Sequence, residues 1–197
     1  MWNMMKNNKK LFYQLRNWKA HWRAFYLGSY VVVEGALAKW LGNADRITMT
    51  GKLYATVNGA DLGCLGSRVV TTAGVNYLRD DFANGAGGAD ISLFKYHACG
   101  TGTTAEAIGD TALVTECTTA LNPDSTRGVG TQVNSVSKTY SSVATMTFDA
   151  SAAITEHGLF SAASSGTLWD RTVFAAINVA SGDSIQFTYT LTISDGG

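Results

Sequence analysis

The sequence has little charge and almost no proline, and both shortages constrain what kind of protein it is. Charged residues make up 15% of the 197 residues, whereas about 25% is usual in globular proteins. Hydrophobic residues make up 46%, which is enough to bury a core without disulfides or metals. The chain has a single proline, so proline interrupts few strand ladders. These features favour a folded domain with an uncharged surface rich in Thr, Ser, Ala, Gly and Asn.

Cysteine and long apolar runs are also scarce. Cys64, Cys99 and Cys117 are odd in number and lack C-x-x-C spacing, so they predict neither a disulfide framework nor a zinc site. We expect all three to be reduced, buried side chains in a protein made in a cytoplasm. No apolar run reaches the roughly 20 residues that span a bilayer, and the basic start is not followed by the apolar stretch of a secretory signal. We therefore expect no transmembrane segment.

Acidic residues are missing from the first 33 positions, where Glu34 is the first carboxylate. Six of the 15 basic residues lie before residue 28, so the remainder has nine bases against 15 acids and a net charge of about −6. A split of this kind predicts a basic arm that meets a partner, joined to a mildly acidic body. We divide the chain into an arm, residues 1–28, and a β domain, residues 29–197.

The arm is predicted to form an amphipathic helix over about Met5–Tyr26, ending at Gly28. Apolar side chains recur at spacings of three and four, which places them on one stripe, and basic residues fall on the other side. The side chains expected to bind a partner are Leu11, Leu15, Arg16, Trp18, Lys19, Trp22, Arg23 and Phe25. Three interpretations stay open: docking in a groove of a partner subunit, lying in a membrane interface, or packing on its own β domain. Nucleic acid is the less favoured partner, and binding to phosphates would weaken steeply with salt.

The body is predicted to be all-β with one short helix. Ile47–Val57 is rich in strand-forming residues, and Asn58-Gly59 is a strong hairpin signal leading into Leu62–Val70. Thr71 or Thr72 can cap a helix over Ala73–Phe82. Its expected inner face is Val75, Leu78 and Phe82. We expect another strand over Ile91–His97 and a glycine- and threonine-rich loop over Gly100–Asp110.

From Arg127 onward the pattern is that of β-strands, with one over Leu168–Val179. The last strand has strict alternation, with Ile185 to Ile193 pointing one way at every second position, which is typical of a half-buried antiparallel strand. The predicted fold is an antiparallel β-sandwich or jelly roll of about eight strands.

Residues with catalytic potential are few and scattered. The run Gly100–Thr104 lacks the lysine of a phosphate-binding loop. His97 and Cys99 share a strand face and could form a nucleophile pair, but a structural histidine is the favoured interpretation. His157, beside Glu156, is expected to cap a turn. The acids Asp80, Asp81 and Asp90 are expected to be solvated, and the sequence reveals no pair of facing buried carboxylates suited to glycoside hydrolysis. We therefore expect no enzyme activity, cofactor or metal, with a cell-wall hydrolase as the competing hypothesis.

Two stretches of the chain resemble tailed-bacteriophage structural proteins that contain a small β domain. The first runs from Ser67–Asn76 to Phe94–Leu113 and includes the "GTGTTA…DTAL" pattern. The second comprises Ala153–Phe160, Leu168–Arg171 and Gly182–Phe187. The resemblance covers roughly residues 65–197 and carries no catalytic residues. It implies a virion protein that assembles with other copies, often around three-fold or other symmetry axes, in head decorations, collars or tail appendages.

The expected function is that of a capsid cement or decoration protein. The β domain would sit on the outside of the head, and the arm would bind the major capsid protein or a neighbouring copy. Self-association, for example as a trimer, is part of this expectation. The alternative is a neck or tail adaptor, or a receptor-binding tail appendage; for a glycan-binding appendage the only late tryptophan, Trp169 beside Asp170, gives thin support. In either case the protein would reside in the virion, which is assembled in the host cytoplasm.

Overall fold

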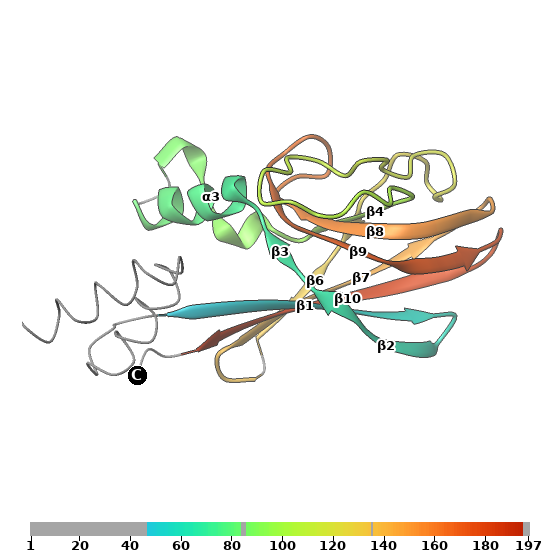
Figure 1. Cartoon of the computed structure of the whole chain (residues 1–197), viewed down its shortest axis with the longest axis horizontal. Coiled ribbons are helices and arrows are strands. Elements are labelled where there is room, and N and C mark those ends of the chain that lie inside the picture. Colours follow the sequence, from blue (N-terminus) through green and yellow to red (C-terminus); the bar gives the residue numbers. More distant parts are fainter. Residues whose placement is uncertain (1–46, 84–85, 135, 195–197) are drawn as a thin grey trace, which may run out of the picture. The chain divides into compact units, whose positions relative to one another are not determined.

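The computed structural model describes residues 47–83, 86–134 and 136–194 (Figure 1). The predicted arm helix lies outside these residues. The described elements, in chain order, are β1 (Thr48–Val57), β2 (Ala60–Ser67), β3 (Val69–Val70), α3 (Thr72–Phe82), the 3-10 turns η1 (Ala86–Gly88) and η2 (Ile91–Leu93), β4 (Tyr96–Gly100), β5 (Gly128–Val129), β6 (Thr131–Val133), β7 (Thr139–Thr147), β8 (Ala152–Phe160), β9 (Leu168–Val179) and β10 (Ser184–Ser194).

The strands form two five-stranded antiparallel sheets. Sheet A has the order β2-β1-β10-β7-β6, and sheet B has the order β3-β9-β8-β4-β5. The predicted β-sandwich is confirmed in its coarse form, with ten described strands in place of about eight. The Asn58-Gly59 hairpin is confirmed as well, because both residues have positive φ (48° and 83°). The two-residue turn whose twist matches that of the flanking strands requires positive φ at both positions.

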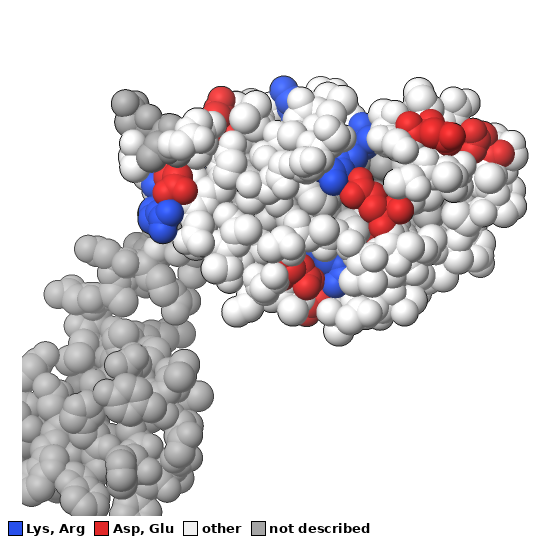
Figure 2. Space-filling model, turned by 90° about the horizontal axis from the view of Figure 1, so that it is seen from above, with Lys and Arg blue, Asp and Glu red and all other residues white. Residues whose placement is uncertain are grey.

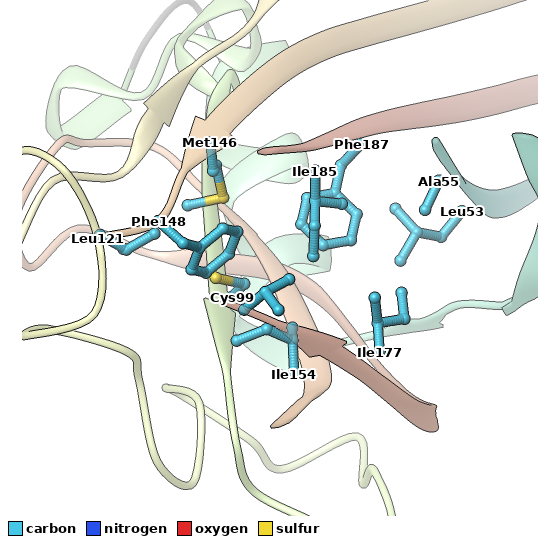
Figure 3. Packing of buried hydrophobic residues seen from close by; sticks show 11 residues of the cluster. Leu53, Ala55, Cys99, Leu121, Met146, Phe148, Ile154, Ile177, Ile185 and Phe187 are labelled. Atoms are coloured by element: carbon cyan, nitrogen blue, oxygen red, sulfur yellow. The ribbon is translucent and has the colours of Figure 1, made fainter. Parts of the chain in front are cut away.

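The main core lies between the two sheets. Figure 3 shows Ile185 of sheet A together with Ile154 and Cys99 of sheet B in this layer. The predicted alternation of the last strand is confirmed, because its inward positions from Ile185 to Leu191 are at most 7% exposed; only Ile193 at the strand end is 38% exposed. The core cluster comprises Leu53, Ala55, Cys99, Leu121, Met146, Phe148, Ile154, Ile177, Val179, Ile185 and Phe187.

Two local predictions need correction. Helix α3 begins after Thr71, whose hydroxyl accepts a hydrogen bond from Gly74 N (3.0 Å), as a helix N-cap should. However, Val75 and Phe82 are 54% and 82% exposed, so two of the three residues predicted for the inner face are wrong, and only Leu78 packs against a core cluster. The helix is rotated because Gly74 packs on the backbone of Trp169, where an added Cβ would lie 2.7 Å from its carbonyl oxygen.

The second correction concerns the segment before β4. Residues Ile91–Leu93 form a 3-10 turn rather than a strand, because the Asp90 side chain accepts a hydrogen bond from Ser92 N (2.9 Å) and starts the turn. A strand begins only at Tyr96. After β4 the chain makes a long excursion, residues 101–127, which covers the outer face of sheet B (Figure 1). This segment is called the covering loop below.

Candidate functional site

The eight partner-binding residues predicted in the arm lie outside the described residues, so the structure places none of them. Among the described residues, the polar groups that could carry chemistry gather instead on sheet B. They form one network on its inner face, toward sheet A, and another on its outer face, beneath the covering loop.

The inner-face network is a chain of four side chains drawn from distant parts of the sequence. An Arg68 Nη1 lies 2.9 Å from His157 Nδ1. His157 Nε2 lies 3.0 Å from His97 Nδ1, and His97 Nε2 lies 2.8 Å from Ser142 Oγ. Arg68 also forms a buried ion pair with Asp170. All five residues are at most 7% exposed.

The direction of hydrogen bonding in this chain follows from the arginine. A guanidinium can only donate, so His157 Nδ1 accepts and its Nε2–H donates to His97 Nδ1. His97 must then donate from Nε2 to the Ser142 hydroxyl. A serine nucleophile requires the opposite, a histidine that accepts the hydroxyl proton. The array therefore resembles a catalytic triad only in composition, and it ties the two sheets together.

Burial keeps the two histidines uncharged. Desolvation, with the nearby Arg68 charge, lowers the pKa of His97 to about 3 and holds the pKa of His157 well below its ordinary value. Desolvation also raises the pKa of Asp170, with the Arg68 charge opposing this shift. Within the described residues, Asp170 Oδ2 and Arg68 Nε have no hydrogen-bond partner. The inner-face network is thus buried, and two of its polar atoms lack a hydrogen-bond partner.

The outer-face network centres on Glu156, which is fully buried. Its carboxylate accepts hydrogen bonds from the backbone N–H groups of Gly102 (3.0 Å), Val114 (3.1 Å) and Thr115 (2.7 Å). It also accepts one from Arg171 Nε (2.8 Å). One side chain in the middle of β8 therefore fixes the covering loop at two separate places.

This network explains the glycine-rich passage. A Cβ added at Gly102 would collide with the Glu156 carboxylate, and one at Gly100 would collide with Thr115 O. The loop was predicted not to bind phosphate. In the structure, its Gly102 N–H donates to the Glu156 carboxylate of the protein itself. The signal missed in the sequence was Glu156, whose partners in the covering loop lie more than 40 residues away.

The far end of the covering loop is closed by Arg127. Its guanidinium donates to both carboxylate oxygens of Glu116 (2.7 and 2.9 Å), a bidentate geometry that favours order. It also lies over the Phe160 ring, 3.5 Å from the centroid, and donates to the carbonyl oxygens of Ala162 and Ser165. The loop is therefore held to sheet B by hydrogen bonds to Glu156 and by the Asp110–Arg171 ion pair, and to itself by the Arg127–Glu116 ion pair.

The candidate residues chosen from sequence are accordingly reassigned. His97 is a satisfied structural histidine, as predicted, whereas the turn-capping role predicted for His157 is wrong because it lies buried in the middle of β8. Cys64 is exposed and Cys117 only partly buried, so burial holds for Cys99 alone. Glu156 and Asp170 are buried carboxylates on neighbouring strands, which the sequence did not reveal, but each is bound to an arginine.

The described residues contain no cluster of three or more His, Cys, Asp or Glu side chains arranged to hold a metal ion. None of their helices has the length and apolar character needed to cross a membrane.

Comparison with known proteins adds no relative. No protein-family model matches the chain, and no curated protein matches it significantly.

Proposed function

We propose that the chain is a structural protein of a tailed-bacteriophage particle, a cement or decoration protein on the head surface. The observation that supports this concerns the described side chains of the types that often serve in catalysis. The buried histidines, Ser142 and Glu156 are engaged in holding strands and loop together, so the body is suited to standing as a rigid unit rather than to turning over a substrate.

The surface of the body agrees with an assembly role. Figure 2 shows a face on which basic and acidic residues form a few separate groups among uncharged residues. Large apolar side chains are also exposed on the body, including Phe82 and Ile108. Self-association, including trimers around a symmetry axis, is part of this proposal and is supported by the resemblance alone.

In this proposal the arm binds the major capsid protein or a neighbouring copy. Its aromatic and leucine stripe would be buried in the partner, and its basic face would meet acidic side chains. Each large side chain buried would contribute about 1.5–3 kcal/mol before the cost of ordering the arm. The arm would thereby strengthen the shell against the pressure of packaged DNA.

Removing residues 1–27 tests the proposal. The described body has cores of its own, so we expect the shortened chain to keep a cooperative unfolding transition. We also expect it to lose binding to particles that lack the protein, measured by co-sedimentation. Shortened chain that still decorates the heads would contradict the role of the arm.

A matched pair of substitutions sharpens this test. Trp18→Ala combined with Trp22→Ala removes two members of the stripe, and we expect binding to fall at least tenfold. Asn17→Ala changes the same helix away from the stripe and should bind as the unchanged chain does. Equal binding by both would mean that the stripe does not face the partner.

The structure weakens one alternative, a glycan-binding tail knob. Trp169, which the sequence offered as a binding aromatic, is only 3% exposed and donates from Nε1 to the Tyr189 hydroxyl (2.8 Å). A neck or tail adaptor that binds protein remains the competing proposal, and the number of copies per particle separates it from decoration.

A further inference from the structure

Two of the three cysteines lie directly opposite each other on sheet B. Gly100 of β4 forms an antiparallel bridge with Glu116 of the covering loop. The bridge places Cys99 across from Cys117, whose backbone N–H donates to Cys99 O (2.8 Å). Residues paired in this way have Cα atoms about 5.5 Å apart, within the range that a disulfide spans.

The two thiols differ in access to solvent and in charge state. Cys99 is fully buried in the core, whereas Cys117 is only partly buried at its edge. A hydrogen bond from the Cys99 thiol to the Cys117 sulfur raises the pKa of Cys99 well above its ordinary value. The same bond lowers the pKa of Cys117 to about 6.

The charged groups around the pair act against ionisation but do not cancel this effect. Asp124 and Asp149 face Cys117 and raise its pKa, as partial burial does, and Glu116 acts in the same direction on Cys99. The pair therefore places a partly buried thiol with a lowered pKa, Cys117, beside a fully buried thiol with a raised pKa, Cys99. Reactive thiols have this character, since the thiolate is the nucleophile.

We propose that Cys99 and Cys117 form a redox-active pair, in which Cys117 reacts with a hydroperoxide and Cys99 then closes a disulfide within the chain. The Cys117 thiolate attacks the terminal oxygen of the hydroperoxide and the O–O bond breaks, which leaves Cys117 as a sulfenic acid and releases the alkoxide, or hydroxide where the oxidant is hydrogen peroxide. The Cys99 sulfur then attacks the Cys117 sulfur, the S–O bond breaks, and the Cys99 proton leaves with the departing oxygen as water. The protein loses two electrons, and the peroxide gains them.

The bond would fasten the covering loop to β4 at a point that hydrogen bonds alone now hold. Closing a loop of this size restricts the unfolded chain and so stabilises the folded one. The inference does not depend on the proposed function. A chain that is made in a reducing cytoplasm and leaves it would be oxidised on release.

The test uses the full chain carrying Cys64→Ser, because Cys64 is exposed and would otherwise exchange with the pair. The protein is treated with hydrogen peroxide and alkylated, and then cleaved after glutamate. Cleavage after Glu106 separates Cys99 from Cys117, so only a disulfide can keep the two peptides together. We expect a joined, reducible peptide pair and a higher thermal midpoint. Two freely alkylated cysteines after peroxide treatment would overturn the proposal.

A second variant separates the roles of the two thiols. With Cys117→Ser added, Cys99 should stay unmodified by peroxide. In the Cys64→Ser chain, alkylation of Cys117 by iodoacetamide should rise with pH around a midpoint near 6. Alkylation of Cys99 in preference to Cys117, or a midpoint at an ordinary thiol pKa, would contradict the assignment.

Discussion

The two faces of sheet B stabilise buried charged side chains in different ways. On the inner face, Arg68 and Asp170 form an ion pair that continues through His157, and one polar atom of each member of the pair lacks a partner among the described residues. On the outer face, the Glu156 carboxylate is surrounded by backbone N–H groups and Arg171. Neighbouring residues of the same strands build both, because successive side chains point to opposite faces.

The two networks are expected to affect the stability of the fold in different ways. The inner network includes two histidines, so its effect on stability depends on protonation. The outer network binds backbone amides, so its effect depends on charge and on the fit of the loop around one carboxylate. Removing one member of a buried pair leaves the other charge uncompensated, which is why both networks should be sensitive to substitution.

The largest effect is expected on the outer face. Glu156→Gln removes the negative charge beside Arg171 and turns an amide N–H₂ toward backbone donors, so the free energy of unfolding should fall by about 3–5 kcal/mol. Urea unfolding monitored by tryptophan fluorescence measures it. Asp110→Asn is the control, because Asp110 is a partly exposed partner of Arg171, and it should cost less than about 1 kcal/mol. Equal costs would show that the outer network does not centre on Glu156.

The inner face should make stability depend on pH. His97 and His157 have folded pKa values below 6.5, so below that pH the unfolded chain takes up protons that the folded chain does not. Stability should therefore fall as pH drops below about 6.5, by about 1.4 kcal/mol per pH unit for each histidine. Asp170, with its raised folded pKa, opposes this loss at lower pH.

The measurement is the free energy of unfolding between pH 7 and 5, in the unchanged chain and in His97→Gln. The variant should lose about half of the slope, because it removes one of two buried neutral histidines. A stability that is flat over this range, or a slope that the variant leaves unchanged, would show that the histidines are charged or accessible in the folded protein.

A smaller effect on stability is expected from glycine substitutions in the covering loop. They distinguish the close fit of the loop around Glu156 from the general flexibility of its glycines. Gly102→Ala places a methyl group against the Glu156 carboxylate and should cost about 1–3 kcal/mol, as overpacking does. Gly109→Ala in the same loop meets open space and should change stability by less than about 1 kcal/mol. If the two substitutions behave alike in thermal unfolding, the loop does not close around Glu156.

Local features of the fold could be predicted from the sequence, and distant contacts could not. The Asn58-Gly59 hairpin, the alternation of β10 and the Thr71 cap each depend on residues within a few positions of one another. The prediction for the inner face of α3 was wrong at Val75 and Phe82 because periodicity favours large apolar residues, whereas the helix contacts Trp169 through Gly74.

The polar networks were beyond the reach of sequence reasoning for a related reason. His97 and His157 are 60 residues apart, and Arg68 and Asp170 are 102 apart. Only the pairing of β3, β9, β8 and β4 brings them together, and no local pattern encodes that register. The same holds for Cys99 and Cys117, which lack any recognised spacing and meet through one bridge beside Gly100. The predicted arm residues stay predictions.

Copy number tests the central claim, that this is an abundant assembly protein of the phage head, most directly. Quantitative mass spectrometry of purified particles would give copies of this chain per major capsid protein. The account predicts hundreds of copies in a simple ratio to the shell protein. A count of about three to twenty would place the chain at the neck or tail and contradict the decoration role, and its absence from the particle would contradict a virion role altogether.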